Sequence, residues 1–161
     1  MVNIYSLLKL LHIVAVIVFL GNIITGLYWM RQANKTNSLA IISFTIRGII
    51  NSDKWFTIPG VIIITAGGIA TAVEGGIPLL KTGWIFWSIV LFAISGIIFG
   101  VRVAPLQKMI FRISLSNENE FDRSLFQSKL KQWEFWGFLA LITPVVALAM
   151  MVLKIPARSI F

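Results

Sequence analysis

Residues 7–26 read LLKLLHIVAVIVFLGNIITG and decide the fold class of this protein. The apolar run that contains them, from about residue 5 to residue 29, is long enough to cross the hydrocarbon core of a bilayer as a helix. It holds His12, the one histidine of the chain. Because an imidazole without a partner in hydrocarbon costs several kcal/mol, we expect His12 to face other helices, water or a ligand.

His12 belongs to a stripe of mainly small and polar residues on this first helix. Ala15, Phe19, Asn22 and Gly26 follow it at spacings of three, four, three and four, which places all five on one face. We expect this face to turn toward neighbouring helices. Asn22 lies near the middle of the membrane, where an amide usually bonds to a neighbouring helix, and we therefore interpret it as structural.

The composition is that of an integral membrane protein. The chain has 161 residues, of which 58% are hydrophobic and 12% are charged, and its mean hydropathy is +0.90. This composition is too apolar for a soluble domain. We therefore expect a single integral-membrane domain over residues 1–161. The net charge of +8 comes from basic residues beside the hydrophobic spans, where membrane orientation explains them, so we expect no nucleic-acid binding.

Four apolar segments predict four transmembrane helices, over about residues 5–29, 55–73, 84–103 and 136–153. Residues 37–53 have apolar side chains at helical spacing and predict either a short amphipathic helix on the membrane surface or a cytoplasmic extension of the second span. The flanks of the polar segment 108–131 suit helical continuations into the cytoplasm. We therefore expect an all-α membrane protein, a four-transmembrane-helix antiparallel bundle with cytoplasmic helical extensions.

The second and fourth spans also carry stripes of small and polar residues, which let helices approach closely. The stripe of the second span consists of Asp53, Thr57, Gly60, Ile64, Gly67, Thr71 and Glu74. The stripe of the fourth span consists of Ala140, Thr143, Ala147, Met150 and Lys154.

Lysine and arginine set the expected orientation. The first and third connections hold ten of these residues, whereas the rest of the chain holds four. The positive-inside rule then predicts a multi-pass protein of the cell (inner) membrane with both termini outside and the first and third connections in the cytoplasm. The ten residues are Arg31, Lys35, Arg47, Lys54, Arg102, Lys108, Arg112, Arg123, Lys129 and Lys131.

This topology gives the depth of His12 and its expected neighbours. A rise of about 1.5 Å per residue from Tyr5 places the imidazole roughly 10 Å below the outer boundary. Gly67 and Gly68 of the second span lie at that level and leave room for a flat group. The alternative is a structural role, in which the ring forms a hydrogen bond to a neighbouring side chain or backbone carbonyl and holds the helices together. The side-chain partners considered are Thr71 and Ser88.

Two methionines and one lysine complete the candidate site. Met150 or Met151 of the fourth span could bring a thioether opposite the imidazole, a pair that suits haem iron or a soft copper ion; the alternative is packing or lipid contact. Lys9, about one turn from His12, either snorkels to the outer headgroups or binds a propionate or a substrate carboxylate. Predicted cofactor-binding residues are thus His12, Met150, Met151, Gly67, Gly68 and Lys9, with His12 as the metal ligand.

Several classes of chemistry lack their parts in this sequence. The chain has one histidine, no cysteine and no paired carboxylates within a span, which excludes hydrolysis by a catalytic triad or by two carboxylates. A metal held only by side chains would need several good ligands, which His12 alone does not supply. Haem brings its own donors and needs only one or two from the protein. This argument favours haem over a bare ion.

Four motifs carry a resemblance to a known family. They are LLKLLHIVAVIVFLGN in the first span, DKWFTIPGVIIITAGGIATA in the second, GWIFWSIVLFAISG in the third and MVLKIP at the end of the fourth. Together they resemble an uncharacterised bacterial integral-membrane family, a domain-of-unknown-function group. That group is allied to the CopD-like membrane domain of copper-resistance protein D and to the small haem-binding protoporphyrinogen oxidase. The resemblance implies a four-helix membrane bundle in which a first-span histidine, here His12, is associated with haem.

Three functions remain open at this point. The first is a membrane protein that binds haem b and has a redox or haem-handling role, which would make it a haem-dependent oxidoreductase if it is an enzyme. The second is a non-enzymatic accessory or scaffold subunit in which His12 only packs helices. The third is a small permease for a metal or solute. Expected partners are the lipid bilayer and either a second copy of the chain or another membrane protein.

Overall fold

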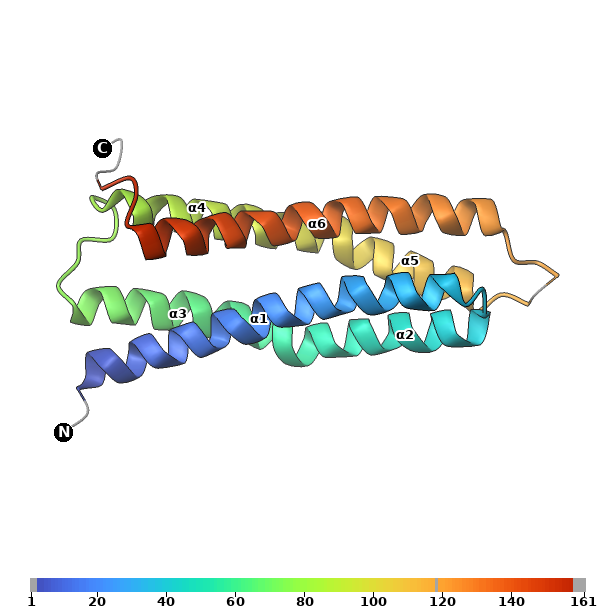
Figure 1. The fold of residues 1–161 in the computed structure, drawn as a ribbon, viewed down its shortest axis with the longest axis horizontal. Helices are drawn as coiled ribbons and strands as arrows, with labels where there is room; N and C mark the ends of the chain where they lie inside the picture. The colour runs from blue at the N-terminus through green and yellow to red at the C-terminus, as the bar shows by residue number, and fades with distance from the viewer. Residues whose placement is uncertain (1–2, 118, 158–161) are drawn as a thin grey trace.

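The computed structural model describes residues 3–117 and 119–157, which form helices joined by short turns and include no strand. Figure 1 shows the order of the elements along the chain. They are α1 (Ile4–Lys35), α2 (Leu39–Ser52), η1 (Asp53–Thr57), α3 (Ile58–Glu74), α4 (Gly83–Ile98), η2 (Phe99–Val103), α5 (Ala104–Ser114) and α6 (Arg123–Leu153).

These elements make four long rods, because α2, η1 and α3 are continuous, as are α4, η2 and α5. The rods cover Ile4–Lys35, Leu39–Glu74, Gly83–Ser114 and Arg123–Leu153, and each is long and apolar enough to cross a membrane. The expected all-helical fold with four spans is therefore confirmed. Each rod exceeds the roughly 20 residues that cross the hydrocarbon core, so all four extend beyond it.

The extensions explain where the helix bounds differ from the sequence-based ones. Residues 37–53 were expected as a surface helix or as an extension of the second span, and from Leu39 on they continue that span as one rod. The fourth helix begins at Arg123 rather than near residue 136. Its first turns alternate charged residues with buried Phe126, Leu130 and Trp133, a pattern that packs on other helices but has too low a mean hydropathy to be recognised as a span.

Two prolines account for the π-helical segments η1 and η2. A proline has no N–H to donate and its ring clashes with the carbonyl four residues earlier. Just before Pro59 and Pro105, the helix widens by one residue, so that Ile58 N–H donates to the Asp53 carbonyl and Ala104 N–H donates to the Phe99 carbonyl. Such wide turns are frequent at functional sites, and here the first of them begins at Asp53.

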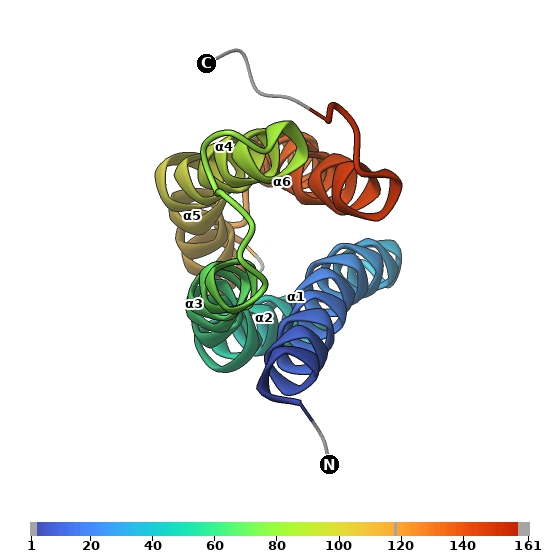
Figure 2. The same ribbon diagram turned by 90° about the vertical axis from the view of Figure 1, so that its left-hand side faces the viewer.

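The four rods associate as two pairs. α1 packs along α3 and α4 packs along α6, and these are the most extensive contacts in the molecule. Figure 2, which looks along the bundle from the end that holds both termini, shows the two pairs on opposite sides. Between them, the rings of Phe19 and Phe92 lie 5.5 Å apart. At the other end, α2, α5 and the beginning of α6 come together around α1.

The best-packed part of the core lies where α2, α5 and α6 meet α1. Met30, Ile46, Ile110 and Phe126 are almost completely buried there. A smaller cluster of Ala15, Phe19 and Ile64 joins α1 to α3 nearer the termini. Other buried members of the main cluster are Ala33, Ile42, Ile49, Val103, Leu106, Leu130, Trp133 and Ala140.

The predicted stripes face neighbouring helices. On the second rod, Asp53, Thr57, Gly60, Ile64 and Gly67 are all buried, whereas Glu74 at its end is exposed. On α6, Ala140 and Ala147 are buried, and their carbonyls accept hydrogen bonds from Ser95 Oγ at 2.6 Å and Ser88 Oγ at 3.1 Å. Small and hydroxyl side chains thus hold α4 against α6.

Candidate functional site

His12 faces α3. Its Nδ1 lies 2.9 Å from the Ile64 carbonyl oxygen, and the ring is half-buried. A carbonyl can only accept, so Nδ1 donates, and in the neutral ring Nε2 then keeps its lone pair. Of the hydrogen bonds considered for His12, the bond to a backbone carbonyl is the one present, since Thr71 Oγ1 donates to the Gly67 carbonyl and Ser88 donates to α6.

The two glycines make room for His12 itself. A Cβ on Gly68 would lie 2.9 Å from His12 Cε1, which is closer than real Cβ contacts, and 3.2 Å from Nδ1, which is a tight contact. A Cβ on Gly67 would lie 3.7 Å from His12 Cβ, an ordinary contact. The flat group that Gly68 admits is thus the imidazole, and a cofactor plane at Gly68 would require the ring to move.

The two methionines expected near His12 lie elsewhere, whereas Lys9, three residues before His12 on α1, has an exposed side chain. Met150 and Met151 are half-buried at the end of α6. Figures 1 and 2 both show the end of α6 apart from the beginning of α1. The structure therefore brings His12, Gly67 and Gly68 together, but not the two methionines.

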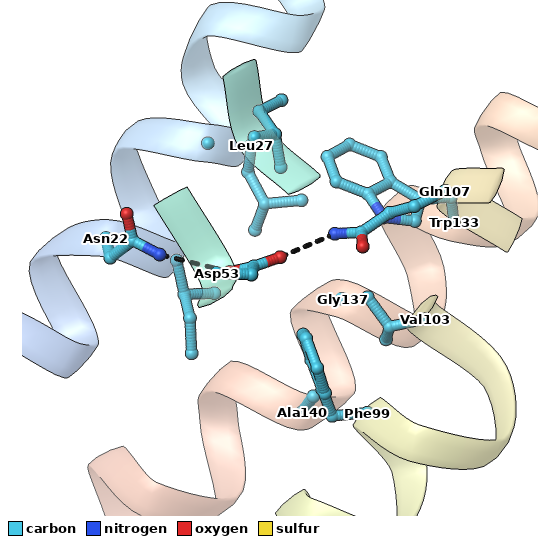
Figure 3. Close-up of a pocket in the computed structure, with 12 residues that line it drawn as sticks. Asn22, Leu27, Asp53, Phe99, Val103, Gln107, Trp133, Gly137 and Ala140 are labelled. Atoms are coloured by element: carbon cyan, nitrogen blue, oxygen red, sulfur yellow. Dashed lines mark hydrogen bonds between the residues drawn. The ribbon is translucent and has the colours of Figure 1, made fainter. Parts of the chain in front are cut away.

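A second polar centre surrounds the carboxylate of Asp53, which is 8% exposed. Its Oδ1 accepts hydrogen bonds from Asn22 Nδ2 at 3.0 Å and from Thr57 Oγ1 at 2.7 Å. Its Oδ2 accepts one from Gln107 Nε2 at 2.8 Å. Figure 3 shows Asn22 and Gln107 reaching Asp53 from opposite sides. One carboxylate thereby connects three of the four rods.

This centre is held by neutral donors. The three side chains bonded to Asp53 are an amide, a hydroxyl and an amide. The nearest basic residues along the rods, Lys54 and Arg102, are exposed, and Arg102 lies over the Trp136 ring at 5.2 Å. An ionised carboxylate removed from water depends on such hydrogen bonds for its stability. The buried Asp53 carboxylate therefore depends on these three neutral donors for its stability.

A cavity of about 30 Å³ adjoins the Asp53 centre. Trp133 is 2% exposed, and its Nε1 has no hydrogen-bond partner within residues 3–117 and 119–157. Figure 3 shows its indole beside the Gln107 amide. The cavity is lined by Asn22, Ile23, Gly26, Leu27, Ile49, Asp53, Phe99, Val103, Gln107, Trp133, Gly137 and Ala140.

The sequence contained part of the signal for this centre. Asn22 was expected to bond to a neighbouring helix, as it does, and Asp53 and Thr57 were on the stripe of the second span. Gln107 and Trp133 were missed, because both lie in segments interpreted as a connection or as its flank. A proline six residues after Asp53 and another six residues after Phe99 could have indicated two distorted turns.

Neither centre is a cage for a bare metal ion. Across the described residues, no three histidine, cysteine, aspartate or glutamate side chains come together in a way that could hold one.

Replacing Gln107 tests the importance of the Asp53 centre. Gln107→Leu fills a similar volume but leaves Oδ2 of Asp53 without its donor. We expect the free energy of unfolding in detergent to fall by about 1.5–3 kcal/mol, the usual value for a hydrogen bond to a charged group. Gln132→Leu changes an exposed glutamine of α6 and should have little effect. Equal stability of the two variants would contradict this interpretation.

Replacing Gly68 tests the seat of His12. Gly68→Ala should displace the imidazole and lower stability by about 1–3 kcal/mol, as overpacking usually does. Gly96→Ala is the matched control, because a Cβ on Gly96 meets nothing within 4 Å; it should raise stability by up to about 1 kcal/mol. Thermal unfolding of both variants measures the difference, and a Gly68→Ala variant as stable as Gly96→Ala would argue against the packing described here.

Comparison with known proteins identifies the family. A search of curated proteins finds no match to this chain, and a search of solved structures finds none either. One family model, described as a predicted integral membrane protein (DUF2269), matches residues 6–155, which include both polar centres. The chain therefore belongs to the DUF2269 family of predicted integral membrane proteins.

Proposed function

We propose that this membrane protein binds haem b through His12 and has a redox or haem-handling role. One observation carries the proposal: His12 donates through Nδ1 to the Ile64 carbonyl, which leaves Nε2 as the free lone pair. Histidines that ligate metals nearly always donate their other ring N–H to a carboxylate, a carbonyl or water. The ring thus has the tautomer that an axial ligand needs.

Haem bound in this way would take one ligand from the first helix and supply the redox-active iron. His12 would hold the iron, and Lys9, one turn nearer the end of the helix, is a candidate partner for a propionate. Met150 and Met151 would serve as a second ligand only if the end of α6 approached α1.

The second candidate is an accessory or scaffold subunit, and the same bond favours it. His12 joins α1 to α3 as Ser88 and Ser95 join α4 to α6. In this alternative His12 is one of several links between helices and needs no cofactor. The exposed apolar faces of the rods would then contact lipid, a second copy of the chain or another membrane protein.

An absorbance spectrum separates the two candidates. Protein purified from cells supplied with a haem precursor should have a Soret band, which His12→Ala removes. Ser88→Ala also deletes a side-chain bond to a neighbouring helix but offers no ligand, and it should keep the band. A colourless native protein, or a His12→Ala variant with an unchanged spectrum, would end the haem proposal. If both variants only lower the melting temperature, the scaffold alternative is supported.

We further propose the orientation given by the positive-inside rule, in the cell membrane, with both termini outside. Its support is the gathering of basic residues at one end of the bundle, where Arg31 bonds to Glu134 at 3.1 Å. That end holds the turn after α1 and the connection between α5 and α6. Anionic lipid headgroups of the cytoplasmic leaflet would contact these residues.

Cysteine labelling tests the orientation, because the chain has no cysteine of its own. Leu80→Cys places a thiol in the exposed second connection, and Glu120→Cys places one in the exposed third connection. A maleimide that does not cross membranes should label Leu80→Cys on intact cells and label Glu120→Cys only after the cells are opened. The reverse pattern would invert the topology.

A further inference from the structure

The cavity beside Asp53 has the volume and the polar groups of a hydration site. A water molecule needs roughly 10–15 Å³ of such space and two to four polar partners, and the cavity offers about 30 Å³. Trp133 supplies a buried N–H without a partner. Asp53 and Gln107 supply a carboxylate and an amide on the same cavity wall.

The chemistry of these groups selects water over a cation. Trp133 offers an N–H, and Asn22 and Gln107 direct their NH2 groups at Asp53, so the hydrogens around the carboxylate would repel a cation. Water accepts a hydrogen bond from an N–H and donates one to a carboxylate. It would accept a hydrogen bond from the indole N–H. A buried N–H without a hydrogen-bond partner costs about 1–3 kcal/mol.

We propose that this cavity binds one water molecule between Trp133 Nε1–H and the Asp53–Gln107 pair, and that the hydrated Asp53 carboxylate takes up and releases a proton inside the bundle. The proton adds to a carboxylate oxygen, and the carboxylate becomes a neutral carboxylic acid. The water is the mobile partner that can carry the proton to or from that oxygen.

The surroundings make Asp53 the group that titrates. It is the one titratable residue among those that line the cavity. Lys54, its neighbour on the second rod, and Arg102 on η2 are exposed, and Arg31 on α1 is bonded to Glu134 on α6. Along the rods, the basic end of the bundle lies beyond a packed part of the core. This part consists of Met30, Ile46, Ile110 and Phe126.

The chain contains two aspartates, Asp53 and Asp122, and this allows a clean experiment. Asp122 is exposed and caps α6 through a bond from Leu125 N–H. In protein labelled with ¹³C at the aspartate carboxyl, NMR should show two signals, and Asp122→Asn assigns them without disturbing the core. We expect the Asp53 signal to titrate reversibly, with the Trp133 indole resonance moving in step with it.

The water is detected separately through magnetisation transfer from water to the indole hydrogens. The Trp133 signal, identified by its loss in Trp133→Phe, should receive transfer although the side chain is buried. Trp133→Phe should also move the Asp53 titration curve, whereas Trp55→Phe, which changes an exposed ring two residues from Asp53, should not. An Asp53 signal that is constant over the whole pH range of the folded protein overturns the proton step. Absence of transfer to Trp133 overturns the water site. This result is independent of the haem proposal, which the absorbance spectrum tests.

Discussion

The structure depends on one constraint: a polar group inside a membrane bundle must find its partner within the protein. The Asp53 carboxylate meets this constraint with three donors from three rods. The bond from Gln107 to Asp53 joins the third rod to the second and is fully buried. Because lipid offers no competing partners, such a bond fixes the register of the rods. The position of each rod along its neighbours follows from this bond and from the packed core beside it.

The prolines act on the same region and explain its geometry. Pro59 and Pro105 each remove a backbone donor, and each follows a π-helical turn. The two turns belong to different pairs of helices, yet η1 carries Asp53 and α5, directly after η2, carries Gln107. The backbone is therefore irregular on both sides of the buried Asp53 carboxylate that joins the pairs. An irregular backbone in a membrane is tolerated where it is covered by protein or lines a cavity, and Asp53, Phe99 and Val103 of the two turns line the cavity here.

The sequence predicted the fold class, the number of spans and the inward faces of the helices, because hydropathy and periodicity act locally. It also predicted an interhelical bond for Asn22. It predicted helical continuations on the flanks of residues 108–131 but not that α6 runs unbroken from Arg123, since Arg123 and Lys129 lower the hydropathy of turns that are still helical. It missed the partners of Asp53, because the encounter of Gln107 with Asp53 depends on how two rods are aligned, and the sequence of neither rod contains that alignment.

The two polar centres lie on one face of α1 and connect it to different helices. His12 and Asn22 are ten residues apart on the same stripe, roughly 15 Å along the helix. His12 bonds within its own pair of helices, whereas Asn22 belongs to the network that joins both pairs. Between them, Phe19 contacts Phe92 across the interface. The half of the bundle around His12 is thus held together by pairwise packing, and the half around Asp53 by a network. A change in the spacing of the two pairs would therefore strain the bond from Gln107 to Asp53, which crosses between them, and leave the bond from His12 to Ile64 within its own pair.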